Sequence, residues 1–291
     1  MLQQAILTHT DAARRTIAER GQVFEHSGHF QTALHQVSFH TCIGPTQSGK
    51  TVNQDAVLAV VCDDHSPIKW ACAIADGVSS SQLSEAGSRI ATWVSLAALF
   101  QSRKWASSRS RALAAIHSAQ SAITGFGAVL QQDLVELKFK PSYLPAPAYR
   151  HVVNRHTYCQ TTLCLVWCDG TSIFMASVGD AGALQSAHGN PCIKLFFPNL
   201  RVSQVNAISP LVPKVELDHW SKIAAPNANL AVFTDGVAKA LSEHTGDELP
   251  ADFNLEQRVL LSRAEECLED LVAATSEEAA DNMTLLVVSP S

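Results

Sequence analysis

Ala73-Ile74-Ala75-Asp76-Gly77-Val78 is a hydrophobic run that ends in an aspartate followed by a glycine. The same arrangement returns at Leu230-Ala231-Val232-Phe233-Thr234-Asp235-Gly236-Val237. Each run predicts a buried strand with a carboxylate at its end, and the glycine lets backbone approach a ligand closely. Metal and phosphate sites are commonly built in this way. We therefore expect the two strand ends to meet at one centre.

Two further aspartates lie beside predicted strands. Asp55 comes just before an apolar run at 56–62, and Asp281 shortly precedes the final apolar run at 285–288. Hard divalent ions prefer carboxylate and carbonyl oxygens, so four aspartates and a glycine carbonyl are suitable ligands for them. Because His and Cys are missing from this set, zinc is disfavoured there.

Composition excludes several classes of function. Hydrophobic residues make up 46% of the 291 residues and charged residues 16%, which is typical of a globular protein. The chain has 21 basic and 27 acidic residues, a net charge of −6, and no run of Lys or Arg, so we expect neither nucleic acid nor a membrane surface as a partner. There is no apolar stretch long enough to span a bilayer and no signal-peptide core, which predicts a cytoplasmic location.

A second metal site must be considered at the cysteines. Cys159, Cys164 and Cys168 cluster near His156, but the chain contains no CxxC pair. Cys164 and Cys168 fall on one face of a predicted strand, where a thiol behaves as a small hydrophobic group. We expect core cysteines here, and zinc is the weaker alternative.

The order of elements predicts the fold class. Helices are expected from about Asp11 to Arg20, from Ser110 to about Leu137, near Val237 to Ser242, and from Leu255 to Ala274. Three strands, Thr161–Trp167, Ser172–Val178 and Ala183–Ser186, are predicted to form an antiparallel meander. Proline-containing residues 139–158 show no periodicity and are interpreted as an irregular insertion. Because strands and helices come in groups without βαβ alternation, an α+β layered sandwich is expected instead of a Rossmann-type sheet.

One motif favours a different function. Gly44-Pro45-Thr46-Gln47-Ser48-Gly49-Lys50-Thr51 matches the phosphate-binding pattern GxxxxGK[ST] of P-loop NTPases. That pattern requires a helix beginning at the lysine, whose N-terminal amides hold the phosphates. A β-branched run at 57–61 follows too soon for such a helix. The P-loop NTPase is therefore kept as the less favoured alternative.

Six short motifs together resemble those of the PPM, or type-2C, metal-dependent Ser/Thr protein phosphatases, particularly bacterial ones. They occur in the family's order from about residue 36 to the C-terminus. They are Lys50-Thr51-Val52-Asn53-Gln54-Asp55, Ala75-Asp76-Gly77, Gln160-Thr161-Thr162-Leu163, Val178-Gly179-Asp180, Phe233-Thr234-Asp235-Gly236 and Asp281-Asn282-Met283-Thr284.

The resemblance implies a four-layer αββα sandwich with two central antiparallel sheets, and two Mn²⁺ or Mg²⁺ ions at one edge. By this resemblance Asp76 bridges both ions, Asp235 and Asp281 complete one, and Asp55 with the Gly77 carbonyl holds the other. Asp180 corresponds to a ligand of a third, weaker ion, although a turn aspartate after Gly179 is also common for turn geometry alone. Lys50 stands where the family usually has a phosphate-binding arginine, and it supplies charge without a bidentate fork.

The implied reaction is hydrolysis of phosphoserine or phosphothreonine by in-line attack of a metal-bridging water, without a phosphoenzyme. The implied partner is a phosphorylated protein, the substrate of a cognate Ser/Thr kinase. A pseudophosphatase that binds phosphoproteins without turnover stays an alternative, because Lys50 and the serines after the first Asp-Gly depart from the family pattern. We expect residues 1–35 to form a helical N-terminal extension and residues 36–291 to form the catalytic domain.

Overall fold

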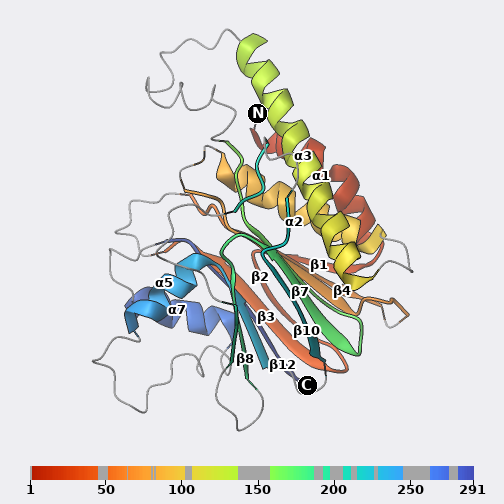
Figure 1. Cartoon of the computed structure of the whole chain (residues 1–291), viewed down its shortest axis with the longest axis vertical. Coiled ribbons are helices and arrows are strands. Elements are labelled where there is room, and N and C mark those ends of the chain that lie inside the picture. Colours follow the sequence, from red (N-terminus) through yellow and green to blue (C-terminus); the bar gives the residue numbers. More distant parts are fainter. Residues whose placement is uncertain are drawn as a thin grey trace.

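Two antiparallel sheets of six strands each form the centre of the molecule, with helices on both outer faces (Figure 1). The computed structural model describes residues 2–44, 52–63, 65–79, 81, 83–101, 107–136, 158–186, 193–196, 206–210, 215–225, 229–244, 263–274 and 281–291. The predicted αββα sandwich with two central antiparallel sheets is confirmed.

The first sheet has the strand order β1-β4-β5-β6-β7-β10, and all its pairs are antiparallel. Its strands are β1 (Gly21–Glu25), β4 (Ala56–Cys62), β5 (Trp70–Ala75), β6 (Leu163–Cys168), β7 (Ser172–Val178) and β10 (His219–Ala224). The second sheet has the order β2-β3-β12-β11-β8-β9 and is also antiparallel throughout. Its strands are β2 (Ser27–Gln31), β3 (His35–Cys42), β8 (Gly182–Ser186), β9 (Ile193–Phe196), β11 (Asn229–Phe233) and β12 (Met283–Pro290).

Helices cover the outer face of each sheet. Helices α1 (Leu2–Ala18), α2 (Ser84–Gln101) and α3 (Ser108–Glu136) lie on the side of the first sheet, and α5 (Asp235–His244) and α7 (Ala264–Ala274) on the side of the second (Figure 1). Three hydrophobic clusters fill the spaces between these four layers, one under each helical layer and one between the sheets. Because both faces of the central strands are covered, every residue of β5, β6 and β7 is buried, and these strands read as continuous apolar runs.

The N-terminal segment contributes to both sheets. Helix α1 begins at Leu2, well before the predicted start near Asp11, and it is followed by β1, which pairs with β4, and β2, which pairs with β3. These two strands were missed because most of their side chains are half-buried or exposed, so they carry no long apolar run. No helix in the described part of the chain has the length and apolar character needed to cross a membrane.

The predicted three-strand meander is wrong for its last strand. Strands β6 and β7 form a hairpin as expected, but β8 pairs with β9 and β11 in the other sheet. The chain changes sheets at Gly179, whose φ of +96° favours glycine. Sequence alternation could not reveal this crossing, because both β7 and the first half of β8 are fully buried. Helix α7 begins at Ala264, later than the predicted Leu255; residues 251–262 lie outside the described part of the chain.

Buried His35 predicts that stability depends on pH. Its ring lies between the Ala225 carbonyl, 2.8 Å from Nε2, and the Trp70 indole N–H, which donates to Nδ1 at 3.4 Å. Burial lowers the pKa of His35, against a smaller opposite effect of the hydrogen bond to Ala225. The neutral ring therefore makes its full contribution to the free energy of unfolding above about pH 6.5, the pKa of histidine in an unfolded chain. This contribution is lost as the pH falls towards the lower pKa of His35 in the folded protein.

We expect the change from pH 7.5 to 5 to be more favourable to the stability of His35→Gln, which cannot titrate, than to that of the wild type, because the variant lacks the loss that comes from His35. Urea denaturation at both pH values in chelator measures this difference. His29→Gln, on the exposed side of β2, serves as the control and should follow the wild type. Equal pH dependence in His35→Gln and the wild type would contradict the prediction.

Candidate metal centre

Asp55 and Asp76 meet at one end of the first sheet. Strands β4 and β5 pair so that Ala56 lies opposite Ala75, which places the residue before β4 beside the residue after β5. The two side chains are close enough for their charges to interact, and Asp55 is 3% exposed. The predicted approach of these two aspartates is therefore present in the structure.

Asp235 and Asp281 meet at the corresponding end of the second sheet. Strands β11 and β12 pair with Phe233 opposite Leu285, and the Thr234 N–H donates to the Thr284 carbonyl at 3.1 Å. Asp235 follows β11 as the first residue of α5, and Asp281 enters β12. Thr234 and Thr284, which lie close to these two acids in the chain, both donate hydrogen bonds to Asp55, so the acids of both sheets share one site.

Two threonines join the sheets at this site. Asp55 Oδ2 accepts hydrogen bonds from Thr234 Oγ1 at 3.0 Å and from Thr284 Oγ1 at 2.9 Å. Thr234 Oγ1 in turn accepts the Thr284 N–H at 3.0 Å. Sequence reasoning did not assign these threonines a role, although each stands next to or near an aspartate in the quoted motifs. They orient Asp55 from the opposite sheet.

The backbone around Asp76 is held by the segment before β6. Thr162 Oγ1 accepts the Asp76 N–H at 3.1 Å, and the Asp76 carbonyl accepts from Thr161 Oγ1 and the Thr162 N–H, both at 2.8 Å. Val78 N–H donates to the Gln160 carbonyl at 3.1 Å. Because Asp76 and Val78 make the hydrogen bonds to residues 160–162, the N–H and carbonyl of Gly77 between them point away from that segment.

Glycine is required at position 77. A Cβ atom there would lie 2.7 Å from the Gln54 carbonyl oxygen and 2.9 Å from Cβ of Ser84. Both contacts are closer than real Cβ atoms tolerate, and the first is to backbone. The second glycine of the site, Gly236, is equally confined by the chain that enters β12.

The acids carry unfavourable charge when no ion is present. Burial raises the pKa of Asp76 well above its ordinary value, and the charges of Asp55 and Asp235 raise it further. Burial likewise raises the pKa of Asp55, against the opposite effect of the hydrogen bonds that it accepts from Thr284 and Thr234. The Asp180 pKa is raised to about 6 by burial and by Asp235. A cluster of buried carboxyl groups that repel one another is a typical feature of a cation site.

Lys239 is the cation that the structure places among these acids. Its Nζ lies 2.6 Å from Asp235 Oδ2 and 2.6 Å from Asp281 Oδ2. Both carboxylate side chains are 15% exposed, and the lysine is 34% exposed. Sequence analysis missed this residue, although its i,i+4 spacing from Asp235 on a predicted helix was a usable signal.

The donor set fits hard divalent ions. Asp55 Oδ1 and Asp235 Oδ1 are buried without a hydrogen-bond partner among the described residues, as oxygens aimed at a missing cation would be. As the side chains lie, however, no three acidic, His or Cys side chains of the described residues form a complete coordination shell. Ion binding at Asp235 and Asp281 therefore requires the Lys239 ion pairs to rearrange.

Comparison with known proteins decides the family. A sequence profile described as protein phosphatase 2C matches residues 46–282, which is most of the chain. The chain belongs to the protein phosphatase 2C family. The family resemblance predicted from the six motifs is thereby confirmed, and with it the class of enzyme, a metal-dependent phosphoprotein phosphatase. No curated protein matches the chain by sequence.

Solved structures of protein phosphatases share the fold. PstP/Ppp of Mycobacterium tuberculosis is 15% identical, with a TM-score of 0.58, and the match covers 88% of this chain and 98% of that one. A serine-threonine phosphatase 2C from Toxoplasma gondii is 10% identical, with a TM-score of 0.58, covering 93% and 100%. The PstP catalytic domain solved with two manganese ions is 15% identical, with a TM-score of 0.58, covering 89% and 99%. At these identities the likeness shows the fold.

The P-loop alternative fails in this phosphatase. Residues 52–55 contain no helix, and β4 begins at Ala56, so the helix that must start at the lysine is missing. Lys50 itself, most of the motif, His156 and residues 139–157 of the predicted insertion lie outside the described residues. The cysteines Cys159, Cys164 and Cys168 are free and buried, as expected of core thiols.

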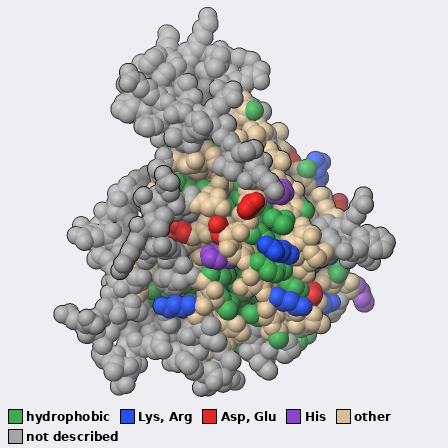
Figure 2. Space-filling model, in the orientation of Figure 1, with side chains coloured by type: hydrophobic (Ala, Val, Ile, Leu, Met, Phe, Trp, Pro, Cys, Tyr) green, Lys and Arg blue, Asp and Glu red, His purple; other side chains and the backbone are tan. Residues whose placement is uncertain are grey.

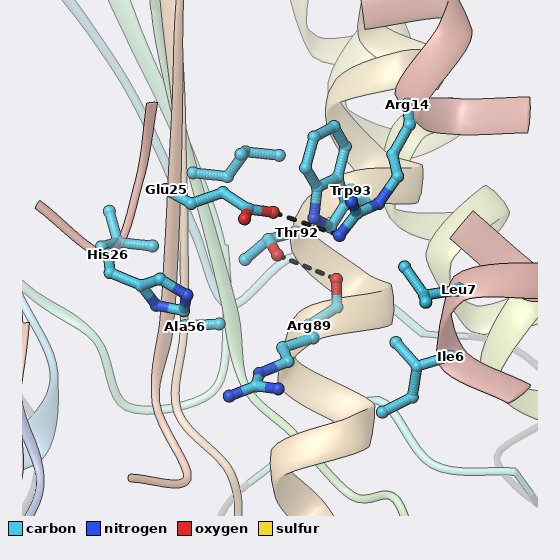
Figure 3. Close-up of a pocket in the computed structure, with 11 residues that line it drawn as sticks. Ile6, Leu7, Arg14, Glu25, His26, Ala56, Arg89, Thr92 and Trp93 are labelled. Atoms are coloured by element: carbon cyan, nitrogen blue, oxygen red, sulfur yellow. Dashed lines mark hydrogen bonds and ion pairs between the residues drawn. The ribbon is translucent and has the colours of Figure 1, made fainter. Parts of the chain in front are cut away.

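A separate cavity of about 190 Å³ lies between α1, α2 and the adjoining strands (Figure 3). Its one carboxylate, Glu25, is bonded to Arg14 at 3.3 Å, and the Arg14 guanidinium lies 4.6 Å from the Trp93 ring centre. The cavity therefore has no group of acids for a cation. It marks where the N-terminal helix packs on the phosphatase sandwich.

We expect Gly236→Ala to disrupt the phosphatase centre. A Cβ atom at Gly236 would lie 2.0 Å from the Asn282 carbonyl oxygen, so α5 and the start of β12 must separate. The expected loss of stability is about 1–3 kcal/mol, together with weaker Mn²⁺ binding, because Asp235 and Asp281 move apart. Gly125→Ala in α3 meets no atom within 4 Å and is the matched control. It should be neutral or stabilising by up to about 1 kcal/mol in thermal denaturation. Equal stability of the two variants would contradict the account.

Proposed function

We propose that this chain hydrolyses phosphoserine and phosphothreonine in a protein substrate, using two divalent metal ions. The observation that supports this most is the convergence of Asp55, Asp76, Asp235 and Asp281 from two different sheets on one buried site, where strand pairing and the threonine hydrogen bonds to Asp55 bring them together. Such an arrangement is costly without cations, since the carboxylates repel one another in a poorly solvated place. Protein phosphatase 2C family membership gives the site its chemical class.

Mn²⁺ or Mg²⁺ would be held by oxygen ligands only. Asp76 would coordinate both ions. Asp235 and Asp281 would coordinate one of them, and Asp55 and the Gly77 carbonyl would coordinate the other. The PstP catalytic domain, which shares the fold, was solved with two manganese ions. When bound, such a pair of ions lowers the pKa of water and neutralises charge on the phosphate.

The protein's own residues orient and isolate this site. Thr234 and Thr284 fix the Asp55 carboxylate by two hydrogen bonds, so its second oxygen, Oδ1, is left for a cation. Thr162 fixes the backbone of Asp76. We propose that Lys50 binds the substrate phosphate and that water displaces the serine or threonine oxygen in line, with no covalent enzyme intermediate.

A phosphorylated protein is the proposed partner, together with the kinase that produces it. On the face drawn in Figure 2, acidic, basic and hydrophobic side chains of the described residues are interspersed, without a large patch of basic residues. This agrees with the net charge of −6 and favours a protein partner over nucleic acid on that face.

A pair of variants tests the proposal against its alternatives. The wild type should hydrolyse p-nitrophenyl phosphate and a phosphothreonine peptide with Mn²⁺, lose this activity in chelator, and hydrolyse no ATP beyond background. Asp281→Asn should abolish phosphopeptide hydrolysis, and Lys50→Ala should mainly raise KM, by about tenfold for one lost charged contact. A folded protein that binds Mn²⁺ and phosphopeptide without turnover would identify a pseudophosphatase and overturn the proposal.

A further inference from the structure

Lys239 occupies a position that the proposed function gives to a metal ion. The residue lies one turn into α5, so its side chain and that of Asp235 project from the same face of the helix. Its ammonium also reaches across to Asp281, at the start of β12 in a distant part of the sequence. The lysine ammonium therefore bridges the two carboxylates that would jointly coordinate one of the metal ions.

The contacts use particular oxygens. Lys239 Nζ contacts Oδ2 of Asp235 and Oδ2 of Asp281, each at 2.6 Å. Asp281 Oδ1 accepts the Asn282 N–H at 2.8 Å, and Asp235 Oδ1 has no partner among the described residues. Of these four oxygens only Asp235 Oδ1 has no hydrogen-bond partner among the described residues while the lysine is in place. An ion that uses the two Oδ2 atoms must displace the ammonium.

Lys239 also neutralises charge in the metal-free chain. Asp235 and Asp281 are both largely buried, and a third acid, Asp180, is close enough to feel the charges of all three residues. Removing one partner of a partly buried ion pair leaves the other charge uncompensated, which is destabilising. The lysine therefore stabilises the site most when no divalent ion is there.

We propose that Lys239 is an internal competitor for one of the two metal ions: its ammonium binds Asp235 and Asp281 in the metal-free chain and must be displaced before an ion binds there. This inference rests on the proposed two-ion centre. Among the described residues no cation is paired with Asp55, so the ion on the Asp55 and Gly77 side should bind more tightly. The affinity of the second ion then sets the metal concentration at which the site is complete.

Calorimetric titration with MnCl₂ tests the proposal without measuring activity. We compare the wild type, Lys239→Met, which keeps a long unbranched side chain but removes the charge, and Lys239→Arg, which keeps the charge. The control is Lys222→Met on β10, whose ammonium lies 5.6 Å from the Phe174 ring centre and which removes the same net charge elsewhere. Thermal denaturation in chelator is measured for all four proteins.

Lys239→Met should bind the weaker Mn²⁺ at least about tenfold more tightly than the wild type, since the carboxylates no longer have to give up a charged partner. In chelator the same variant should melt at lower temperature than the wild type. Lys239→Arg should keep both the weak second site and the melting temperature, and Lys222→Met should match the wild type in Mn²⁺ binding.

Several results would overturn the proposal. They are unchanged or weaker Mn²⁺ binding in Lys239→Met, an unchanged melting temperature of that variant in chelator, or an equal gain of affinity in Lys222→Met. If Lys239→Met folds only with metal, the Mn²⁺ concentration at which half of it is folded is measured instead. A concentration above the dissociation constant of the weaker ion in the wild type overturns the proposal. Failure of the proposed function looks different: the Lys239 effects on binding and melting would persist in a protein that hydrolyses no phosphopeptide.

Discussion

Replacing Asp76 with asparagine is expected to lower kcat/KM for a phosphothreonine peptide by about a thousandfold or more, equivalent to about 4 kcal/mol of transition-state stabilisation. Asp76 is the acid that interacts electrostatically with all three of the other predicted ligands, so it is the one whose charge both ions would share. An amide keeps the shape of the side chain but loses this charge. The fold is preserved because the interactions that hold position 76 involve its backbone.

The matched control is Asp169→Asn. Asp169 also precedes a glycine and also follows a buried strand, but it lies at the opposite end of the first sheet, in the β6–β7 turn. Its carboxylate accepts hydrogen bonds from the Thr171 and Ser172 N–H groups, both at 2.9 Å, which is an ordinary turn function. We expect its activity within about threefold of the wild type, because the change is a surface turn substitution. Equal losses in the two variants would mean that the Asp-Gly motif acts structurally.

The second large effect is that Mn²⁺ reverses which of two proteins, the wild type or Asp76→Asn, is the more stable. In chelator at pH 8, Asp76→Asn is expected to be more stable than the wild type, because the amide removes a buried negative charge that neighbouring acids repel. Burial raises the pKa of Asp76 and of Asp55. A raised acid pKa means that the folded state gains stability at low pH and loses it as pH rises from about 4 through the folded pKa. The wild type should therefore also gain stability as pH falls from 8 to 6, and the variant should gain less.

Manganese should reverse this order. At a hundredfold excess over its dissociation constant, one bound ion stabilises the wild type by about 2.7 kcal/mol. The variant lacks the shared carboxylate and should gain much less. Urea denaturation with Mn²⁺ and with chelator gives all four values. The account would be contradicted if Asp76→Asn were destabilising in chelator, or if Mn²⁺ stabilised both proteins equally.

The sequence predicted the acids of the site because their signal is local. Asp76 and Asp235 each end a fully buried apolar strand and are followed by glycine, a pattern visible without any partner strand. Antiparallel pairing of the strands then places the acids together. The two sheets could be expected for the same reason, since grouped strands without βαβ alternation favour antiparallel layers.

The missed features depend on contacts between distant parts of the chain. Thr234 and Thr284 act on Asp55, which lies 179 and 229 residues away, and no local pattern reports such a hydrogen bond. The i,i+4 pair of Lys239 with Asp235 could have been found in a helix, but its second contact, to Asp281, could not. Strand β8 was placed in the wrong sheet because its buried first half carries no information about which neighbour it pairs with.

A crystal structure of the chain grown with Mn²⁺, with anomalous difference maps collected at the manganese edge, tests the two-ion centre most directly. The account predicts two peaks about 3.5–4 Å apart, with Asp76 contacting both, Asp55 and the Gly77 carbonyl on one, Asp235 and Asp281 on the other, and Lys239 moved away from both carboxylates. A map with no peak at these aspartates, in crystals where the Lys239 ion pairs persist at saturating Mn²⁺, would contradict the two-ion centre.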